Sequence, residues 1–97
     1  MTVYVDDMRR QVLIEAVQWS HLFATTSQEL HEFAARLDQK REWVEAEGTI
    51  REHYLLTEPE RIAAIAAGAV PISYPRGVGL LLAARRRRVV TDKESDR

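Results

Sequence analysis

The sequence contains no cysteine and no long apolar run. Disulfides, thiolate metal sites and a cysteine nucleophile are therefore excluded, and the composition suits a reducing cytoplasm. The longest apolar run, residues 78–84, is far too short to cross a bilayer, which takes about 20 residues. Charged side chains stand in the opening residues, where a signal peptide would be apolar. We therefore expect a cytoplasmic protein with no membrane partner.

Neither sign of charge is in excess, because 14 Lys and Arg face 15 Asp and Glu, for a net charge of −1. This balance gives no general argument for nucleic acid or for a membrane surface. A chain of 97 residues, 45% hydrophobic and 30% charged, fits one small globular domain. We expect a single domain over residues 1–90 and a charged, disordered tail over residues 91–97.

The opening stretch, residues 2–7, combines strand-favouring residues with two carboxylates. Thr, Val, Tyr and Val are β-branched or aromatic, and the run ends at Asp6 and Asp7. If this strand lies in an open α/β sheet, both aspartates stand at its carboxyl end, where such folds bind ligands. The alternative is that one aspartate caps a turn through its own backbone.

Two helices have clear start signals. Thr26 and Glu29 form a capping box, and apolar residues at helical spacing follow, which predicts a helix over residues 27–39. Thr57 and Glu60 form a second capping box, and Gly68 is placed to end that helix.

Strand-like segments alternate with these helices. Residues 17–23, 50–56 and 70–72 have strand character, and residues 79–87 suit a last helix. This order predicts an α/β fold with a mainly parallel sheet of about four strands, two main helices and a C-terminal helix. The helices starting at Thr26 and Thr57 would then begin at the same sheet edge as Asp6 and Asp7.

The three histidines are the first candidates for chemistry. Imidazole and carboxylate together suit a divalent metal, which predicts Asp6, Asp7, His21 and His31 as ligands and His21 or His53 as an acid–base group. Their spacing matches no recognised metal motif. Each histidine also has a plain structural alternative: packing on a strand tryptophan, lying at the edge of an amphipathic helix, or hydrogen bonding beside a tyrosine.

A second candidate is an anion site. Free backbone N–H groups at the helix starts near Thr26 and Thr57, with Arg9, Arg10 and Arg76, would suit a phosphorylated small molecule or nucleic acid. The alternative is that the capped helices already use their own donors.

The run of four arginines at residues 85–88 could contact nucleic acid. It lacks interleaved aromatic residues for base stacking, and such a run is more often a solvated helix end. The serines show no nucleophile-elbow context, so acyl transfer has no support.

Five blocks of sequence, at residues 1–8, 19–22, 29–34, 53–54 and 64–70, resemble the bacterial and phage family called domain of unknown function 4031. The resemblance implies a shared site, because the family pattern is built around Asp6, Asp7 and the three histidines. The chain departs from that pattern at Leu55, where an aspartate is usual, and at Val44-Glu45, where Phe-Gln is usual. The resemblance implies no activity.

Three hypotheses follow. The leading one is a metal-dependent hydrolase or nuclease-like domain that uses the Asp/His cluster. The alternative is a non-enzymatic module that binds phosphate, nucleotide or nucleic acid. A third is a subunit whose partner is a protein, including a second copy of itself. The sequence leaves open whether the domain is an enzyme.

Overall fold

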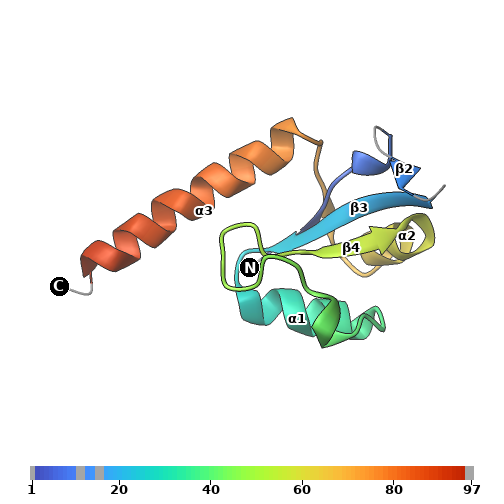
Figure 1. Ribbon diagram of the computed structural model, residues 1–97, viewed down its shortest axis with the longest axis horizontal. Helices are drawn as coiled ribbons and strands as arrows, with labels where there is room; N and C mark the ends of the chain where they lie inside the picture. Colours follow the sequence, from blue (N-terminus) through green and yellow to red (C-terminus); the bar gives the residue numbers. More distant parts are fainter. Residues whose placement is uncertain (1, 11–12, 15–16, 96–97) are drawn as a thin grey trace.

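The structure is a computed structural model that describes residues 2–10, 13–14 and 17–95. Strands and helices alternate around one small sheet, and α3 projects away from it (Figure 1). The elements in chain order are β1 (Val3–Val5), η1 (Met8–Arg10), β2 (Leu13–Ile14), β3 (Val17–Ala24), α1 (Ser27–Arg36), η2 (Arg41–Trp43), β4 (Tyr54–Thr57), α2 (Glu58–Ala66), β5 (Val70–Pro71) and α3 (Arg76–Ser95).

The sheet is mixed, so the α/β class is confirmed but the prediction of a mainly parallel sheet was wrong. β3 pairs antiparallel with β1, β2 and β4, and the parallel pair is that of β1 with β5. β1 and β3 are joined by a short return through η1 and β2, without the crossover helix that parallel neighbours need.

A second reversal of the chain explains why β4 is antiparallel to β3 although α1 lies between them in the sequence. Gln39 hydrogen bonds to Glu60 beside the end of β4, whereas Glu45 pairs antiparallel with His53 just before its start. The chain therefore passes once more along the sheet between residues 39 and 45 and turns back at residues 46–52. The predicted strand over residues 50–56 accordingly begins only at Tyr54.

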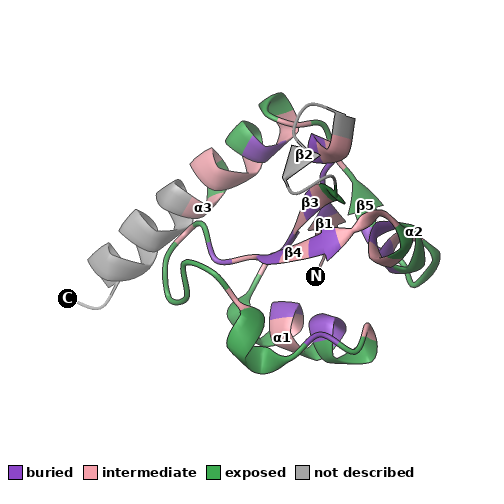
Figure 2. Cartoon of the chain, turned by 45° about the vertical axis from the view of Figure 1, so that its right-hand side comes forward, coloured by how far each residue is buried: buried purple, intermediate pink, exposed green. Residues whose placement is uncertain are grey.

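The core lies between one face of the sheet and helices α1 and α2 (Figure 2). Alternation along β3 sends Leu22 and Ala24 into this core and His21 to the opposite face. Burying a leucine of this kind contributes about 1.5–3 kcal/mol. The core residues are Val5, Leu22, Ala24, Leu30, Phe33, Ala34, Tyr54, Leu56, Ala64 and Ala69.

Both predicted helix starts are confirmed. The Thr26 hydroxyl accepts from the Glu29 N–H at 3.2 Å, and Thr57 and Glu60 form the reciprocal capping box that begins α2. After α2, Gly68 adopts a φ of +111°, which an L side chain rarely tolerates.

The two helix starts lie at opposite ends of the sheet, which corrects the expectation that they share one edge. β3 and β4 are antiparallel, so α1 and α2, each following its strand directly, begin at opposite ends. α2 begins at the Asp6 end, because β1 and β4 run in the same direction beside β3.

The C-terminal helix is longer than predicted, since α3 begins at Arg76 and continues to Ser95, into the charged stretch that follows residue 90. Within the described part of the chain, no helix combines the length and apolar character needed to span a membrane.

Candidate functional site

Asp6 is the most completely enclosed charged side chain at the end of β1, with 0% exposure. Its Oδ1 accepts the backbone N–H groups of His21, at 2.8 Å, and Met8, at 3.2 Å. Its Oδ2 lies 2.6 Å from His21 Nδ1. The buried Arg61 donates from Nε to the Asp6 carbonyl at 2.8 Å. The carboxylate therefore has its two oxygens engaged by β3 and by the turn that follows β1.

The contacts of two imidazole rings define which nitrogen carries a lone pair. The His21 Nδ1 faces the Asp6 carboxylate, and the His53 Nδ1 lies 2.6 Å from the Arg51 carbonyl oxygen. A carboxylate and a carbonyl only accept, so each Nδ1 is the donor. In the neutral form of each ring, Nε2 is then the basic, metal-binding nitrogen.

His21 and His53 meet edge to face, with ring centroids 4.8 Å apart. Phe23 and Tyr74 stack beside His21 at 5.6 and 5.7 Å. The rings line a hollow of about 220 Å³ on the sheet face away from α1. We call this the histidine hollow; its lining is His21, Phe23, Arg51, His53, Tyr74, Val78 and Leu82.

A larger hollow of about 520 Å³ is lined in part by Trp19, Trp43 and Leu55. Leu55 is the cross-strand partner of His21. Glu45, which also lines the larger hollow, lies 3.4 Å from His53 Nε2. The position where the family pattern usually has aspartate is thus directly beside the histidine hollow.

Asp7 does not join Asp6 at one ligand position. The Asp7 Oδ1 accepts the Tyr74 N–H at 2.7 Å, which connects the end of β1 to the loop before α3. The two carboxylates therefore face different segments, as side chains of neighbouring extended residues do.

His31 lies on the other side of the sheet, with α1. Its Nδ1 is 2.8 Å from the Tyr54 hydroxyl, and its Nε2 is 3.6 Å from Glu52 Oε2. Tyr54 pairs with Leu22, whereas its neighbour Leu55 pairs with His21, so the sheet separates the two imidazoles. Burial raises the pKa of the Tyr54 hydroxyl above its ordinary value.

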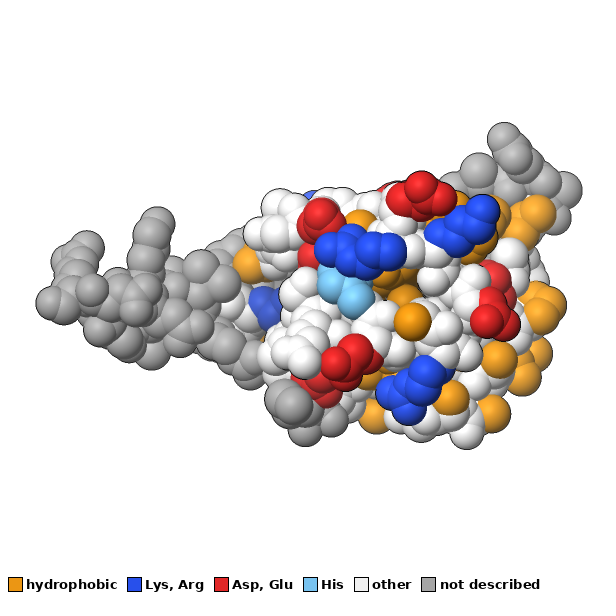
Figure 3. Space-filling model, turned by 90° about the horizontal axis from the view of Figure 1, so that it is seen from below, with side chains coloured by type: hydrophobic (Ala, Val, Ile, Leu, Met, Phe, Trp, Pro, Cys, Tyr) orange, Lys and Arg blue, Asp and Glu red, His pale blue; other side chains and the backbone are white. Residues whose placement is uncertain are grey.

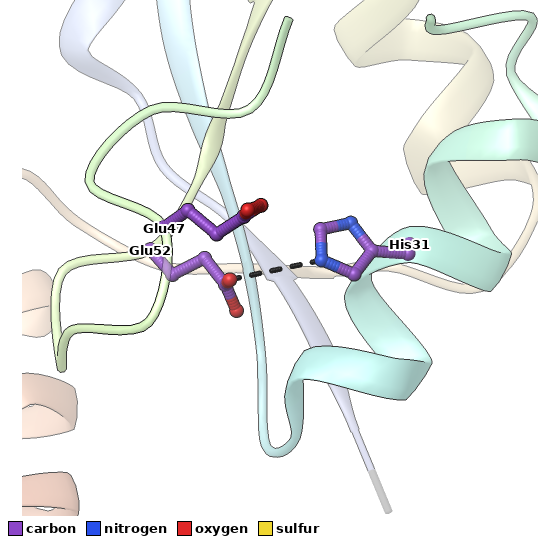
Figure 4. Close-up of side chains that lie close together, drawn as sticks. All are labelled: His31, Glu47 and Glu52. Atoms are coloured by element: carbon purple, nitrogen blue, oxygen red, sulfur yellow. Dashed lines mark ion pairs between the residues drawn. The ribbon is translucent and has the colours of Figure 1, made fainter. Parts of the chain in front are cut away.

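Figure 4 shows His31 pointing from α1 toward two glutamates of the facing turn. The potential ligand atoms of His31, Glu47 and Glu52 all lie within 4.8 Å of one another. Among the described residues, these three side chains form the cluster of potential metal ligands that is this close together. We call it the α1-side cluster.

The predicted anion-binding residues are not gathered at one place. Arg9 pairs with Glu58 at 2.7 Å, and Arg76 is exposed at the start of α3. Thr26 and Thr57 cap helices at opposite ends of the sheet. The side chain of Arg10 lies outside the described residues. Figure 3 shows acidic and basic side chains interspersed on one face of the molecule, without a large patch of one sign.

Sequence reasoning missed Glu45, Glu47, Glu52 and Tyr74 as neighbours of the histidines. Glu52 had a usable signal, because strand alternation places it on the same face as Tyr54. Tyr74 had none, since its contact with His21 joins residues far apart in the chain.

Fold and site together define a small α/β domain with a carboxylate-supported histidine pair on one sheet face and a His/Glu cluster on the other. Residues 3–85 match a family described as protein of unknown function (DUF4031), and the chain belongs to that family. No curated protein matches the chain. No solved structure matches it either.

Proposed function

We propose that the protein is a small hydrolase of phosphate esters, in which His21 and His53 are the acid–base groups. One observation carries this proposal. Both Nδ1 atoms face oxygens that only accept, so two basic Nε2 atoms belong to rings 4.8 Å apart in one hollow. Asp6 is assigned a positioning role, because it is fully buried and its oxygens already accept three N–H groups.

The two histidines have different neighbours, and we assign them different roles, His21 as general base and His53 as general acid. His21, oriented by Asp6, takes a proton from water at Nε2 as the water oxygen attacks phosphorus. His53, whose Nε2 lies 3.4 Å from Glu45 Oε1, is assigned the role of general acid. Protonated His53 then donates to the leaving oxygen as its bond to phosphorus breaks. General acid–base catalysis of this kind contributes about 10²- to 10⁴-fold.

The surroundings favour a small anionic group joined to a planar or apolar one. Arg51 lines the histidine hollow and supplies a positive charge there. Trp19 and Trp43 line the larger hollow, whose Leu55 pairs with His21, and offer apolar surface for the rest of the substrate. The histidine hollow, at about 220 Å³, is smaller than a typical drug-sized site of about 300–1,000 Å³.

The test is hydrolysis of p-nitrophenyl phosphate and bis(p-nitrophenyl) phosphate by untagged protein. We expect His21→Gln and His53→Gln each to lower the rate by about 10²-fold or more, while Asp38→Asn, at an exposed turn, leaves it unchanged. Equal rates in all four proteins would show that the activity comes from elsewhere and would remove the proposal.

A metal-assisted version of the same chemistry uses the same two Nε2 atoms as ligands of a divalent ion that activates the water. The predicted ligands Asp6, Asp7 and His31 are not needed for it. Activity that is lost with EDTA and restored by Mn²⁺ or Zn²⁺ would favour this version, and activity that survives EDTA would favour the acid–base version.

A second candidate is an anion-binding module without chemistry. Arg51 lines the histidine hollow, and the Arg85 guanidinium lies 5.7 Å from the Phe23 ring centroid. Such a module would bind nucleotides or short nucleic acids with an affinity that falls steeply with salt and survives chelation, but without turnover. Salt-independent or absent binding would count against it.

We also propose a cytoplasmic location, supported by the lack of cysteine. Self-association is supported by the exposed side chains Ile62, Val70 and Leu80, at 59, 42 and 68% exposure. A monomer in light scattering would argue against it.

A further inference from the structure

We propose that His31, Glu47 and Glu52, the α1-side cluster, bind one divalent transition-metal ion. This site lies across the sheet from the histidine hollow and does not depend on the proposed phosphate-ester hydrolysis. One imidazole and two carboxylates come from two segments, α1 and the turn at residues 46–52 (Figure 4).

The central observation is a sealed nitrogen with no hydrogen bond. His31 Nε2 is buried from solvent and has no hydrogen-bond partner. The nearest carboxylate oxygen, Glu52 Oε2, is 3.6 Å away, beyond hydrogen-bonding distance. Two ligands bound to zinc at about 2.0–2.1 Å in tetrahedral geometry are roughly 3.4 Å apart. The spacing of this pair therefore suits an ion between the two atoms better than a direct contact.

Both of these ligands are held in place by a second group. Tyr54 Oη lies 2.8 Å from His31 Nδ1 and can accept its proton, which leaves the lone pair on Nε2. The Glu52 side chain is 7% exposed, and its Oε2 accepts the Gly48 N–H at 3.2 Å. Both side chains are therefore positioned before an ion arrives.

Glu47 completes the cluster from the tip of the turn. It lies between Ala46 and Gly48, whose φ angles of 55° and 79° are both left-handed. Its carboxylate is 52% exposed and pairs with Arg41 at 2.8 Å. An exposed pair of this kind contributes little to stability, so Glu47 can exchange Arg41 for an ion at small cost.

The ligand types narrow the choice of ion. Imidazole suits zinc, copper, iron and nickel, whereas carboxylates suit magnesium, calcium and manganese. One imidazole with two carboxylates is therefore best matched by Zn²⁺ or Mn²⁺, with water in the remaining positions. Bound there, the ion would join the turn that precedes β4 to α1.

The experiment is calorimetric titration of chelator-treated, untagged protein with ZnCl₂ and with MnCl₂. We expect one ion per chain for the wild type and an affinity lower by on the order of 100-fold in Glu47→Gln and His31→Gln. The matched controls are Glu42→Gln, an exposed acid in η2, and His53→Gln, in the histidine hollow. Both are expected to bind as the wild type does.

Glu47→Gln keeps the test valid if His31→Gln fails to fold, because Glu47 is half exposed and on a turn. No binding by the wild type, or wild-type affinity in Glu47→Gln, would overturn the proposal. Loss of binding in His53→Gln would move the ion to the histidine hollow and also overturn it. None of these outcomes depends on hydrolytic activity, so the proposed function can fail while this site stands.

Discussion

Replacing the buried carboxylate of Asp6 tests the foundation of the histidine hollow without any knowledge of the substrate. Asp6→Asn keeps the shape and an oxygen that can accept from the backbone N–H groups of His21 and Met8, but removes the charge. Asp6→Ala removes all three acceptor contacts, at 2.8, 3.2 and 2.6 Å. The pair of variants therefore separates the loss of a charge from the loss of hydrogen bonding.

The expected magnitudes follow from these contacts. A hydrogen bond to a charged group contributes about 1.5–3 kcal/mol and a neutral one about 0.5–1.5 kcal/mol. Asp6→Asn replaces charged hydrogen bonds by weaker neutral ones, and it also removes the desolvation penalty of a buried charge, which offsets part of that loss. It should therefore lower the free energy of unfolding by about 1–3 kcal/mol. Asp6→Ala leaves two N–H groups unpaired, at about 1–3 kcal/mol each, and loses the ring contact, at about 1.5–3 kcal/mol, for a total of about 4–9 kcal/mol. That is a large part of a total stability of about 5–15 kcal/mol.

Urea unfolding followed by tryptophan fluorescence measures both values, and ¹⁵N chemical shifts of the His21 ring report its tautomer. In Asp6→Asn the side-chain amide can donate to Nδ1, so we expect the ring proton to move to Nε2. Asp38→Asn is the control and should stay within about 0.5 kcal/mol of the wild type. Equal, near-wild-type stability of both Asp6 variants, with an unchanged tautomer, would refute the assigned hydrogen bonds.

Three further predictions concern the scaffold. Gly68→Ala should lower the free energy of unfolding by about 1–2 kcal/mol because φ is +111°. Gly79→Ala, where a methyl group meets open space in α3, should raise it by up to about 1 kcal/mol. Thermal melting compares the two variants, and similar effects would contradict the backbone assignment. Thr57→Ala should lower stability by about 1 kcal/mol through loss of the capping box, and unchanged urea unfolding would argue against that cap. Burial raises the pKa of Tyr54, so the folded chain keeps a proton that the unfolded chain releases above about pH 10. The free energy of unfolding should therefore fall as the pH rises past that value, and Tyr54→Phe should lack this component. The same alkaline slope in both proteins would contradict this expectation.

Local features were predictable from the sequence because they depend on neighbouring residues. The two capping boxes at Thr26 and Thr57 and the strand character of β1 and β3 are of this kind. The direction of β4 relative to β3 was not predictable from the alternation of strands with helices. It depends on the extra pass between Gln39 and Glu45, a segment whose composition carries no strand signal and which is placed by contacts with distant residues.

The candidate site was predictable in part for the same reason. The contact of Asp6 with His21 joins the carboxyl end of β1 to its pairing partner β3 and supports the importance given to that end. His31 is separated from His21 because α1 covers the opposite face of the sheet. The pattern of apolar residues in a helix does not show which face the helix will cover. Glu47 depends on the turn at residues 46–52, where left-handed φ at Ala46 was not indicated by the residue type.

The segment from Glu45 to Tyr54 connects the two proposed sites, because neighbouring side chains of an extended chain face opposite sides of the sheet. His53 lies against His21 on one face, while its neighbours Glu52 and Tyr54 face His31 on the other. The backbone pair of Glu45 with His53, at 2.8 and 3.1 Å, closes the turn between them. An ion that holds Glu47 beside the already positioned Glu52 therefore restricts the backbone that carries His53. Order in the histidine hollow and occupancy of the α1-side cluster are for that reason expected to rise together.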